Sequence, residues 1–274
     1  MTGEQTIRLS GDADLKGSVL IVAWAEDASS LGVQTADYLI QSLGCREFGE
    51  ILPEGFFPMG GVNVVDDIAR FPESRLYICD NSKLIIFKST IPRMGWYRFL
   101  TSLLDVAQQD CAVKEIYTLG AMISTAAHTV PRLLISIVNN REIKAALEPY
   151  NVMADNDYET PPGQKPTLSS YLAWLAGQRG IPAVNLWVPV PYYLVPVSDP
   201  RSVKRLVYFF NSKYNLGVDF TALDTVIAGQ NNQIARLFEQ SPEIKNMVRK
   251  LEVGEALDGA ESERLAREIA EALK

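Results

Sequence analysis

The feature that most constrains the fold is an unbroken apolar run near the start of the chain, SVLIVAWA at Ser18–Ala25. A run rich in β-branched residues, without polar alternation, is typical of a strand that is covered on both faces. The following turn offers Asp27, Ser29 and Ser30 as helix caps, and the pattern over residues 31–43 predicts a helix. Strand, turn and helix in this order predict an α/β fold.

The same alternation continues along the chain. Further apolar runs predict strands, and stripes at helical spacing predict the helices between them. The expected strands cover about 75–81, 83–89, 114–121, 132–138 and 181–190, and the expected helices about 94–109, 141–147, 168–177 and 200–214. Residues 151–166 are polar and rich in Pro and Asp, which indicates a long loop. We predict a three-layer α/β/α core over residues 1–216.

The character of the sequence changes after Gly217, where strand patterns end and helical patterns continue. We therefore expect residues 217–274 to form a helical C-terminal region. The longest apolar run, Val19–Ala25, is far shorter than the roughly 20 residues of a membrane-spanning helix. The start of the chain also lacks the pattern of a signal peptide, so we expect a cytoplasmic protein without a membrane partner.

Charge and cysteine usage narrow the function classes. The formal net charge of -7 argues against a nucleic-acid partner, which would require clustered Lys and Arg. The three cysteines, Cys45, Cys79 and Cys111, form no CxxC pair, and we expect buried free thiols. The only histidine is His128, which excludes a metal site built from several histidines of one chain.

Nucleotide cofactors are not expected. The chain has neither a GxGxxG turn after a strand nor a GxxxxGK[ST] loop. The turn after the first strand begins with Glu26 and Asp27, whose carboxylates would repel a phosphate from the helix N-terminus. The acidic stretch 155–159 could offer oxygen ligands, but it lacks the calcium-loop pattern and is better interpreted as a solvated loop. We predict no cofactor and no metal site.

Polar residues that follow the strand at 114–121 form the best candidate site. Ligands of open α/β sheets bind at the carboxyl ends of strands, so this loop and the turn after Ala25 are expected to line one pocket. The candidate pocket residues are Glu26, Asp27, Gly120, Ser124, Thr125, His128 and Arg132. In a catalytic interpretation, His128 is the general base, with Ser124 and Asp27 as partners. In the alternative interpretation these side chains cap local backbone and line an interface.

The stretch 177–196 combines several prolines with Trp187, Tyr192 and Tyr193. Residues up to about Val190 are expected to form a late core strand. Pro189, Pro191 and Pro196 should prevent its continuation as an inner strand, because proline lacks a ladder donor. We expect Trp187, Tyr192 and Tyr193 to be candidates for an interface, with one of the two tyrosines at a subunit contact.

The ordered set of segments resembles one known family. The segments are TADYLIQSLG, FPESRLYICDNSKLIIFKS, LGAMISTAAHTVPRLLISIVNN, YETPPGQKPTLSSYLAWLAGQRGIPAVNLWVPVPYYLVP and DPRSVKRLVYFFNSKYNLGVD. Together they resemble the proteasome assembly chaperone 2 family, over about Ser18 to Glu252. The resemblance implies a phosphorylase/hydrolase-like mixed sheet in an α/β/α fold, with helices after the core, and a homo-oligomer.

The resemblance also sets expectations for function. Some relatives are chaperones for proteasome α-rings and dock through a C-terminal tail that contains a tyrosine. This sequence ends in Ala272-Leu273-Lys274, with leucine at the tyrosine position, which argues against docking in that way. We expect a non-catalytic, chaperone-like homo-oligomer, with a trimer preferred, and another protein complex as a further partner. The alternative is a hydrolase, transferase or metabolite-binding protein that uses the pocket around His128.

Overall fold

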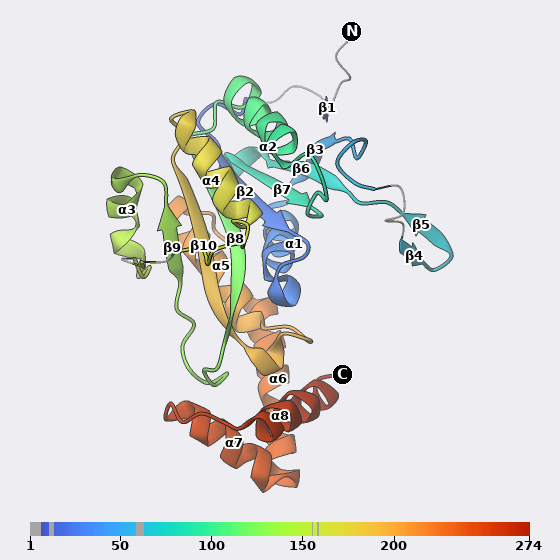
Figure 1. Ribbon diagram of the computed structural model, residues 1–274, viewed down its shortest axis with the longest axis vertical. Coiled ribbons are helices and arrows are strands. Elements are labelled where there is room, and N and C mark those ends of the chain that lie inside the picture. The colour runs from blue at the N-terminus through green and yellow to red at the C-terminus, as the bar shows by residue number, and fades with distance from the viewer. Residues whose placement is uncertain (1–6, 11–13, 59–62, 155, 158) are drawn as a thin grey trace.

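The computed structural model describes residues 7–10, 14–58, 63–154, 156, 157 and 159–274. Its centre is an eight-stranded mixed sheet with the order β1-β3-β6-β7-β2-β8-β10-β9 (Figure 1). In this spatial order the strands span β1 Ile7–Leu9, β3 Arg46–Ile51, β6 Ser74–Cys79, β7 Leu84–Ser89, β2 Val19–Trp24, β8 Glu115–Ser124, β10 Ala183–Pro191 and β9 Ile135–Val138. Asp155, in the acidic stretch, lies outside the described residues.

The middle of the sheet is parallel, from β7 through β2 and β8 to β10. Every residue of β2 is buried, as expected for a strand covered on both faces. The strands at both sides pair antiparallel, including β6 with β7 and β9 with β10. A separate two-stranded hairpin, β4 (Asn63–Val65) and β5 (Ile68–Arg70), projects from the body (Figure 1).

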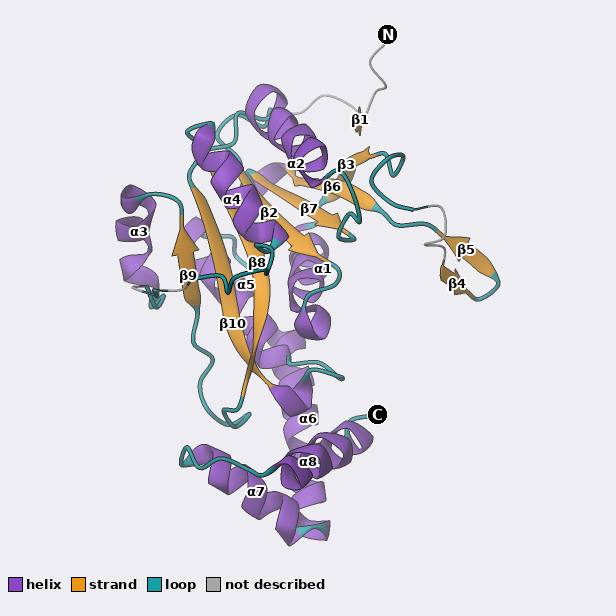
Figure 2. Cartoon of the chain, in the orientation of Figure 1, coloured by secondary structure: helices purple, strands orange, loops and turns teal. Residues whose placement is uncertain are grey.

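Helices cover both faces of the sheet (Figure 2). One face packs against α1 (Leu31–Leu43) and α5 (Pro200–Tyr214), and the other against α2 (Trp96–Asp105) and α4 (Leu168–Gln178). The short helix α3 (Arg141–Leu147) follows β9. Alternate residues of each central strand belong to the two apolar clusters, one on each face of the sheet. This arrangement confirms the predicted three-layer α/β/α fold.

Three further helices follow the core: α6 (Thr221–Gln240), α7 (Pro242–Glu252) and α8 (Gly259–Ala272). Their buried side chains, such as Ile234, Val248 and Leu265, are continuous with the apolar cluster under α1 and α5. α8 begins with a capping box, in which Asp258 and Glu261 each accept from the other's backbone N–H. Across the described parts of the chain, no helix has the length and apolar character to cross a membrane.

Beyond Trp187 the late strand does not continue as an inner strand, as expected from Pro189 and Pro191, but it does continue as an edge strand. β10 continues through Pro189 and Pro191, and both pair in register with β8. The pairing with β9 stops at Trp187, which lies opposite Ile135, the first residue of β9, so no described strand pairs with β10 on that side beyond Trp187. A proline there removes no ladder hydrogen bond, because the lost N–H would face an open edge. The strand ends in a 3₁₀ turn at Tyr192–Leu194 instead of a longer extended exit.

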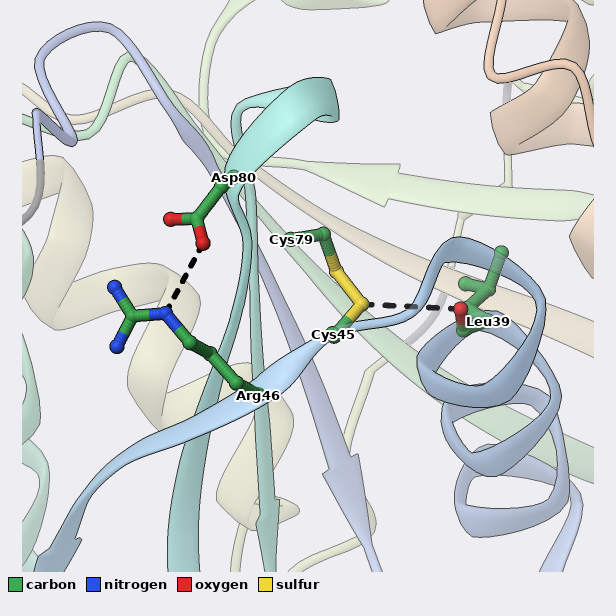
Figure 3. The surroundings of a disulfide bond; sticks show 5 residues. All are labelled: Leu39, Cys45, Arg46, Cys79 and Asp80. Carbon is green, nitrogen blue, oxygen red and sulfur yellow. Dashed lines mark hydrogen bonds and ion pairs between the residues drawn. A yellow bond between two sulfur atoms is a disulfide. The ribbon is translucent and has the colours of Figure 1, made fainter.

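The expectation of free thiols is wrong for two cysteines. Cys45 and Cys79 form a disulfide with a Cα–Cα distance of 4.2 Å (Figure 3). Cys45 lies directly before β3 and Cys79 ends β6, and Arg46 of β3 pairs with Ile78 of β6. The antiparallel register therefore places the two cysteines opposite each other. Cys111 is a buried free thiol, as predicted.

Candidate functional site

The structure places the predicted pocket residues in two separate locations. Glu26, Asp27 and Gly120 line a crevice of about 130 Å³ at the carboxyl ends of β2 and β8. Ser124 and His128 lie farther along the chain, in and after the last part of β8, and do not line that crevice. The pocket predicted from the strand ends exists, but the loop residues expected to complete it lie elsewhere.

The crevice lies at a point where the chain topology reverses. After β2 the chain enters α1 on one face and continues to β3, whereas after β8 it runs toward β9, α4 and β10 on the other side. Connections that leave neighbouring parallel strands in opposite directions open a gap between their carboxyl ends, and ligands of α/β proteins bind in such gaps. Trp24, Trp187 and Ser169 contribute the walls of this crevice.

Asp27 connects three elements beside the crevice through its carboxylate. Its Oδ1 accepts from the backbone N–H of Ala121 at 2.8 Å, and its Oδ2 accepts from that of Gly32 at 3.2 Å. Burial raises the pKa of Asp27 above its usual value, and hydrogen bonds from backbone N–H groups oppose this effect. The residue thus ties the end of β2 to β8 and to the first turn of α1.

Two predicted helix caps do not act as caps. Ser29 and Ser30 have positive φ values of 59° and 50°, and neither side chain makes a capping hydrogen bond to α1. The carboxylate of Asp27 reaches the first turn instead, at Gly32. A Cβ added at Gly32 would lie 3.3 Å from the carbonyl oxygen of Leu119, so glycine allows α1 to approach β8 closely.

His128 is buried and engaged with Tyr193. The Tyr193 hydroxyl accepts from the backbone N–H of His128 at 2.6 Å and lies 2.9 Å from its Nδ1, to which it can donate. The ring also packs against Tyr193 and against Phe238 of α6. Burial lowers the pKa of His128 to about 4, and the nearby Arg201 and Arg132 add to this shift. The imidazole is therefore neutral near pH 7.

Arg132 holds the loop against the N-terminus of α5. Its Nε lies 2.6 Å from Oδ2 of Asp199, and both side chains are almost fully buried. The same oxygen accepts from the hydroxyl of Ser202 at 2.6 Å, and Nη1 of Arg132 donates to the carbonyl of Val130 at 2.8 Å. These contacts favour a structural role for Arg132.

The three catalytic candidates have different partners. The Ser124 hydroxyl accepts from the backbone N–H of Ala126 at 3.1 Å, while Asp27 and His128 are occupied as described above. Among the described residues, no hydrogen bond joins any two of Asp27, Ser124 and His128. Thr125 is exposed and lies directly after β8, at the start of the loop. The geometry resembles local capping more than a nucleophile–base pair.

Sequence reasoning missed two crevice residues, Trp24 and Ser169. The indole Nε1 of Trp24 donates to the hydroxyl of Ser169 at 2.9 Å, which joins the end of β2 to the start of α4. Trp24 is the last residue of β2, so the strand-end rule that selected Glu26 could also have selected it. No sequence pattern could have identified Ser169, because it reaches the crevice only through the packing of α4 against the sheet.

The predicted interface residues have different environments. Tyr193 is fully buried, whereas Tyr192 is partly exposed and packs beside α8. Trp187 is half-buried on the sheet face that carries the crevice. A contact of these residues with another subunit stays a prediction. Within the described ranges, no group of three or more His, Cys, Asp or Glu side chains gathers as a metal site.

Solved structures with the same fold include proteins from bacteria and archaea. A protein of unknown function from Corynebacterium glutamicum has a TM-score of 0.77 at 19% identity, covering 91% of this chain and 96% of its own. One from Mycobacterium tuberculosis has a TM-score of 0.76 at 21% identity, covering 99% and 98%. The Pyrococcus furiosus protein PbaB, an archaeal proteasome activator, has a TM-score of 0.69 at 20% identity, covering 85% and 98%.

Identities at this level show a shared fold. No curated protein matches the chain. The family assignment comes from the sequence model of the PAC2 family, which matches residues 20–237 and thus the α/β core from β2 onward, together with most of α6. The chain belongs to the PAC2 family.

Proposed function

We propose that the protein is a non-catalytic, chaperone-like homo-oligomer that binds other proteins. The family and the structural likeness to a proteasome activator and a proteasome-assembly chaperone homologue support this role. We further propose a cytoplasmic location, a trimer as the assembly, and a division into a core of residues 1–216 and a helical region of residues 217–274. The observation that carries the proposal is an uncovered apolar face of the sheet.

This open face follows from the strand register. Trp187 pairs with Gly120 on one side and Ile135 on the other, and Ile135 bridges to Met153. Directly paired residues point to the same face of a sheet, so these four form one row. The adjacent rows add the Met122–Pro189 pair and Ile137. We define the open face as Met122, Ile135, Ile137, Met153, Trp187 and Pro189.

The open face lacks a covering helix. In Figure 1, α2 and α4 lie over the upper part of the sheet, and the lower ends of β8 and β10 extend beyond them. Met122, Ile137 and Met153 remain 40%, 40% and 44% exposed. Contiguous apolar side chains that face water are typical of protein–protein interfaces. A partner is expected to pack on this face, because Pro189 and Pro191 block the addition of a strand to the free edge of β10.

The alternative of a hydrolase or transferase around His128 has less support. A general base must reach the proton that it removes, yet the Nδ1 of His128 faces the Tyr193 hydroxyl inside the core. Ser124 and Asp27 are engaged with backbone N–H groups instead. The arrangement therefore favours binding over catalysis.

The test is the molar mass of the full chain by size-exclusion chromatography with light scattering. We expect the wild type to form an oligomer and the double variant Met122→Lys/Ile137→Lys to dissociate, because two charges would be buried in the interface. Val226→Lys is the matched control, since Val226 is 54% exposed on α6, away from the open face. A monomeric wild type, or an unchanged mass in the double variant, would contradict the proposal.

A further inference from the structure

The geometry points to a binding site for a small organic cation, with a guanidinium or ammonium head, in the crevice between β2 and β8. The site shares Trp187 with the open face, but it does not include Met122 or Ile137, the residues that are changed in the test of the interface. It is carried by the charge, the aromatic walls and the size of the crevice, and it requires no catalytic step.

The charge of the crevice is entirely negative. Glu26 and Asp27 are its only ionisable lining residues among those described, and no lysine, arginine or histidine contributes to the wall. Burial disfavours the ionised form of Asp27, so a cation beside it would relieve that cost. A phosphate or carboxylate ligand would meet the opposite effect. The crevice is therefore selective for positive charge.

Glu26 is available for a ligand. Glu26 forms an ion pair with Arg93, at 3.4 Å between Oε1 and Nη2, and the two side chains are 36% and 65% exposed. Exposed pairs of this kind contribute at most about 1 kcal/mol. A better placed cation inside the crevice could replace Arg93 as the partner of Glu26.

The aromatic walls suit the same ligand class. Trp24 and Trp187 both line the crevice, and Trp is the aromatic residue with the strongest attraction for cations. Trp24 is held in place by the hydrogen bond from its Nε1 to Ser169 and by an edge-to-face contact with Phe87, with 6.1 Å between the ring centroids. A rigid indole next to carboxylates is typical of sites that bind guanidinium or alkylammonium groups.

The size of the crevice limits the ligand. Its volume of about 130 Å³ is similar to that of cavities of roughly 150 Å³ that admit benzene. A guanidinium head with a short alkyl chain fits this space, whereas a nucleotide does not. A metal ion is a poor match, because two carboxylates with aromatic walls give fewer oxygen ligands than Mg²⁺ or Ca²⁺ requires.

The crevice also provides a variant that should block the ligand without disturbing the fold. A Cβ added at Gly120 would lie 3.9 Å from the Trp187 indole and 3.9 Å from the carbonyl oxygen of Leu186, which is ordinary van der Waals contact. The methyl group of Gly120→Ala should therefore occupy crevice volume while the sheet remains intact. Glu26→Gln removes one charge from an exposed position.

The experiment is isothermal titration calorimetry of the full chain with butylguanidinium and with its neutral analogue butylurea. We expect butylguanidinium to bind with a dissociation constant below about 10 mM, and butylurea to bind at least about tenfold more weakly. Glu26→Gln and Gly120→Ala should each weaken butylguanidinium binding several-fold. Arg93→Gln is the matched control, and it should leave binding unchanged or strengthen it, because it removes the competing cation.

A second arm identifies the source of the cation. A short peptide that contains one arginine, with an acetylated N-terminus and an amidated C-terminus, is titrated in parallel with butylguanidinium. Tighter binding of the peptide assigns the site to an arginine side chain of a partner, and equal or weaker binding assigns it to a free small molecule. Undetectable binding of both cations, equal binding of butylurea, or unchanged affinity in Glu26→Gln and Gly120→Ala would overturn the proposal. Trp187 belongs to both the crevice and the open face, but these results are affinities for butylguanidinium and butylurea, whereas the proposed function is tested by molar mass, so the two proposals fail separately.

Discussion

The hydroxyl of Tyr193 serves both the backbone N–H and the ring Nδ1 of His128, at 2.6 Å and 2.9 Å. This pair joins the end of β10 to the loop after β8, and Phe238 of α6 packs on the other side of the imidazole. The only histidine of the chain therefore links the sheet to the C-terminal helices.

Removal of the Tyr193 hydroxyl should destabilise the protein. Tyr193→Phe leaves a buried backbone N–H and a buried ring nitrogen without a partner, which costs roughly 1–3 kcal/mol of unfolding free energy. Urea denaturation followed by circular dichroism measures this loss. Tyr192→Phe is the matched control at a partly exposed tyrosine, and equal losses in the two variants would argue against the proposed linkage.

Stability should fall as the pH falls below about 6.5. Burial holds the pKa of His128 at about 4, compared with about 6.5 in the unfolded chain, so the unfolded state binds the proton first. The stability is complete above the unfolded pKa and decreases by up to about 3 kcal/mol as the pH falls to about 4. His128→Gln should reduce this slope between about pH 6.5 and 5, above the range where most carboxylates titrate. An unchanged slope would contradict the assignment.

Asp27 should contribute to stability through its backbone contacts. Asp27→Ala leaves the N–H groups of Ala121 and Gly32 without their acceptor, and we expect a loss of roughly 1–3 kcal/mol. Asp27→Asn keeps one side-chain oxygen and should lose less. Thermal and urea unfolding of the two variants give the comparison. An alanine variant as stable as the wild type would show that the residue does not hold β2, β8 and α1 together.

Two glycines should respond in opposite ways to alanine. A Cβ at Gly49 would lie 2.4 Å from the carbonyl oxygen of Arg8, so Gly49→Ala should displace β1 and increase hydrogen exchange at residues 7–9. Gly229 lies within α6 with no atom within 4 Å of an added Cβ. Gly229→Ala should stabilise the protein by up to about 1 kcal/mol. Unchanged hydrogen exchange at residues 7–9 in Gly49→Ala would contradict the assigned register of β1 and β3.

Reduction should weaken the fold through Cys45 and Cys79. Their separation of 34 residues corresponds to a stabilisation of roughly 2–4 kcal/mol by chain entropy. We expect dithiothreitol, or Cys45→Ser with Cys79→Ser, to lower the urea midpoint. Thiol titration of the unfolded, unreduced chain should detect only Cys111. Three reactive thiols would show that the disulfide is absent from the isolated protein.

The sequence predicted what local patterns control. The apolar run at Val19–Trp24 specified β2, and helical spacing with Gly44 after it specified α1 and its end. The rule that ligands bind at strand ends placed Glu26, Asp27 and Gly120 at one crevice, because that rule depends only on strand order and direction.

Features that depend on tertiary pairing were inaccessible. Tyr193 and His128 are 65 residues apart, and only the packing of the loop onto the end of β10 brings them together. Cys45 and Cys79 meet because β3 and β6 are antiparallel neighbours, which no local pattern specifies. The continuation of β10 through Pro191 required knowledge that the pairing with β9 reaches only as far as Trp187.

The most direct test of the central claim is oxidative footprinting of methionines across a dilution series of the full chain. Met122 and Met153 belong to the open face and are 40% and 44% exposed, whereas Met94, outside it, is 49% exposed. The account predicts that Met122 and Met153 are protected at high protein concentration and become reactive on dilution, while Met94 reacts equally throughout. Equal reactivity of all three methionines at every concentration would contradict an interface on the open face.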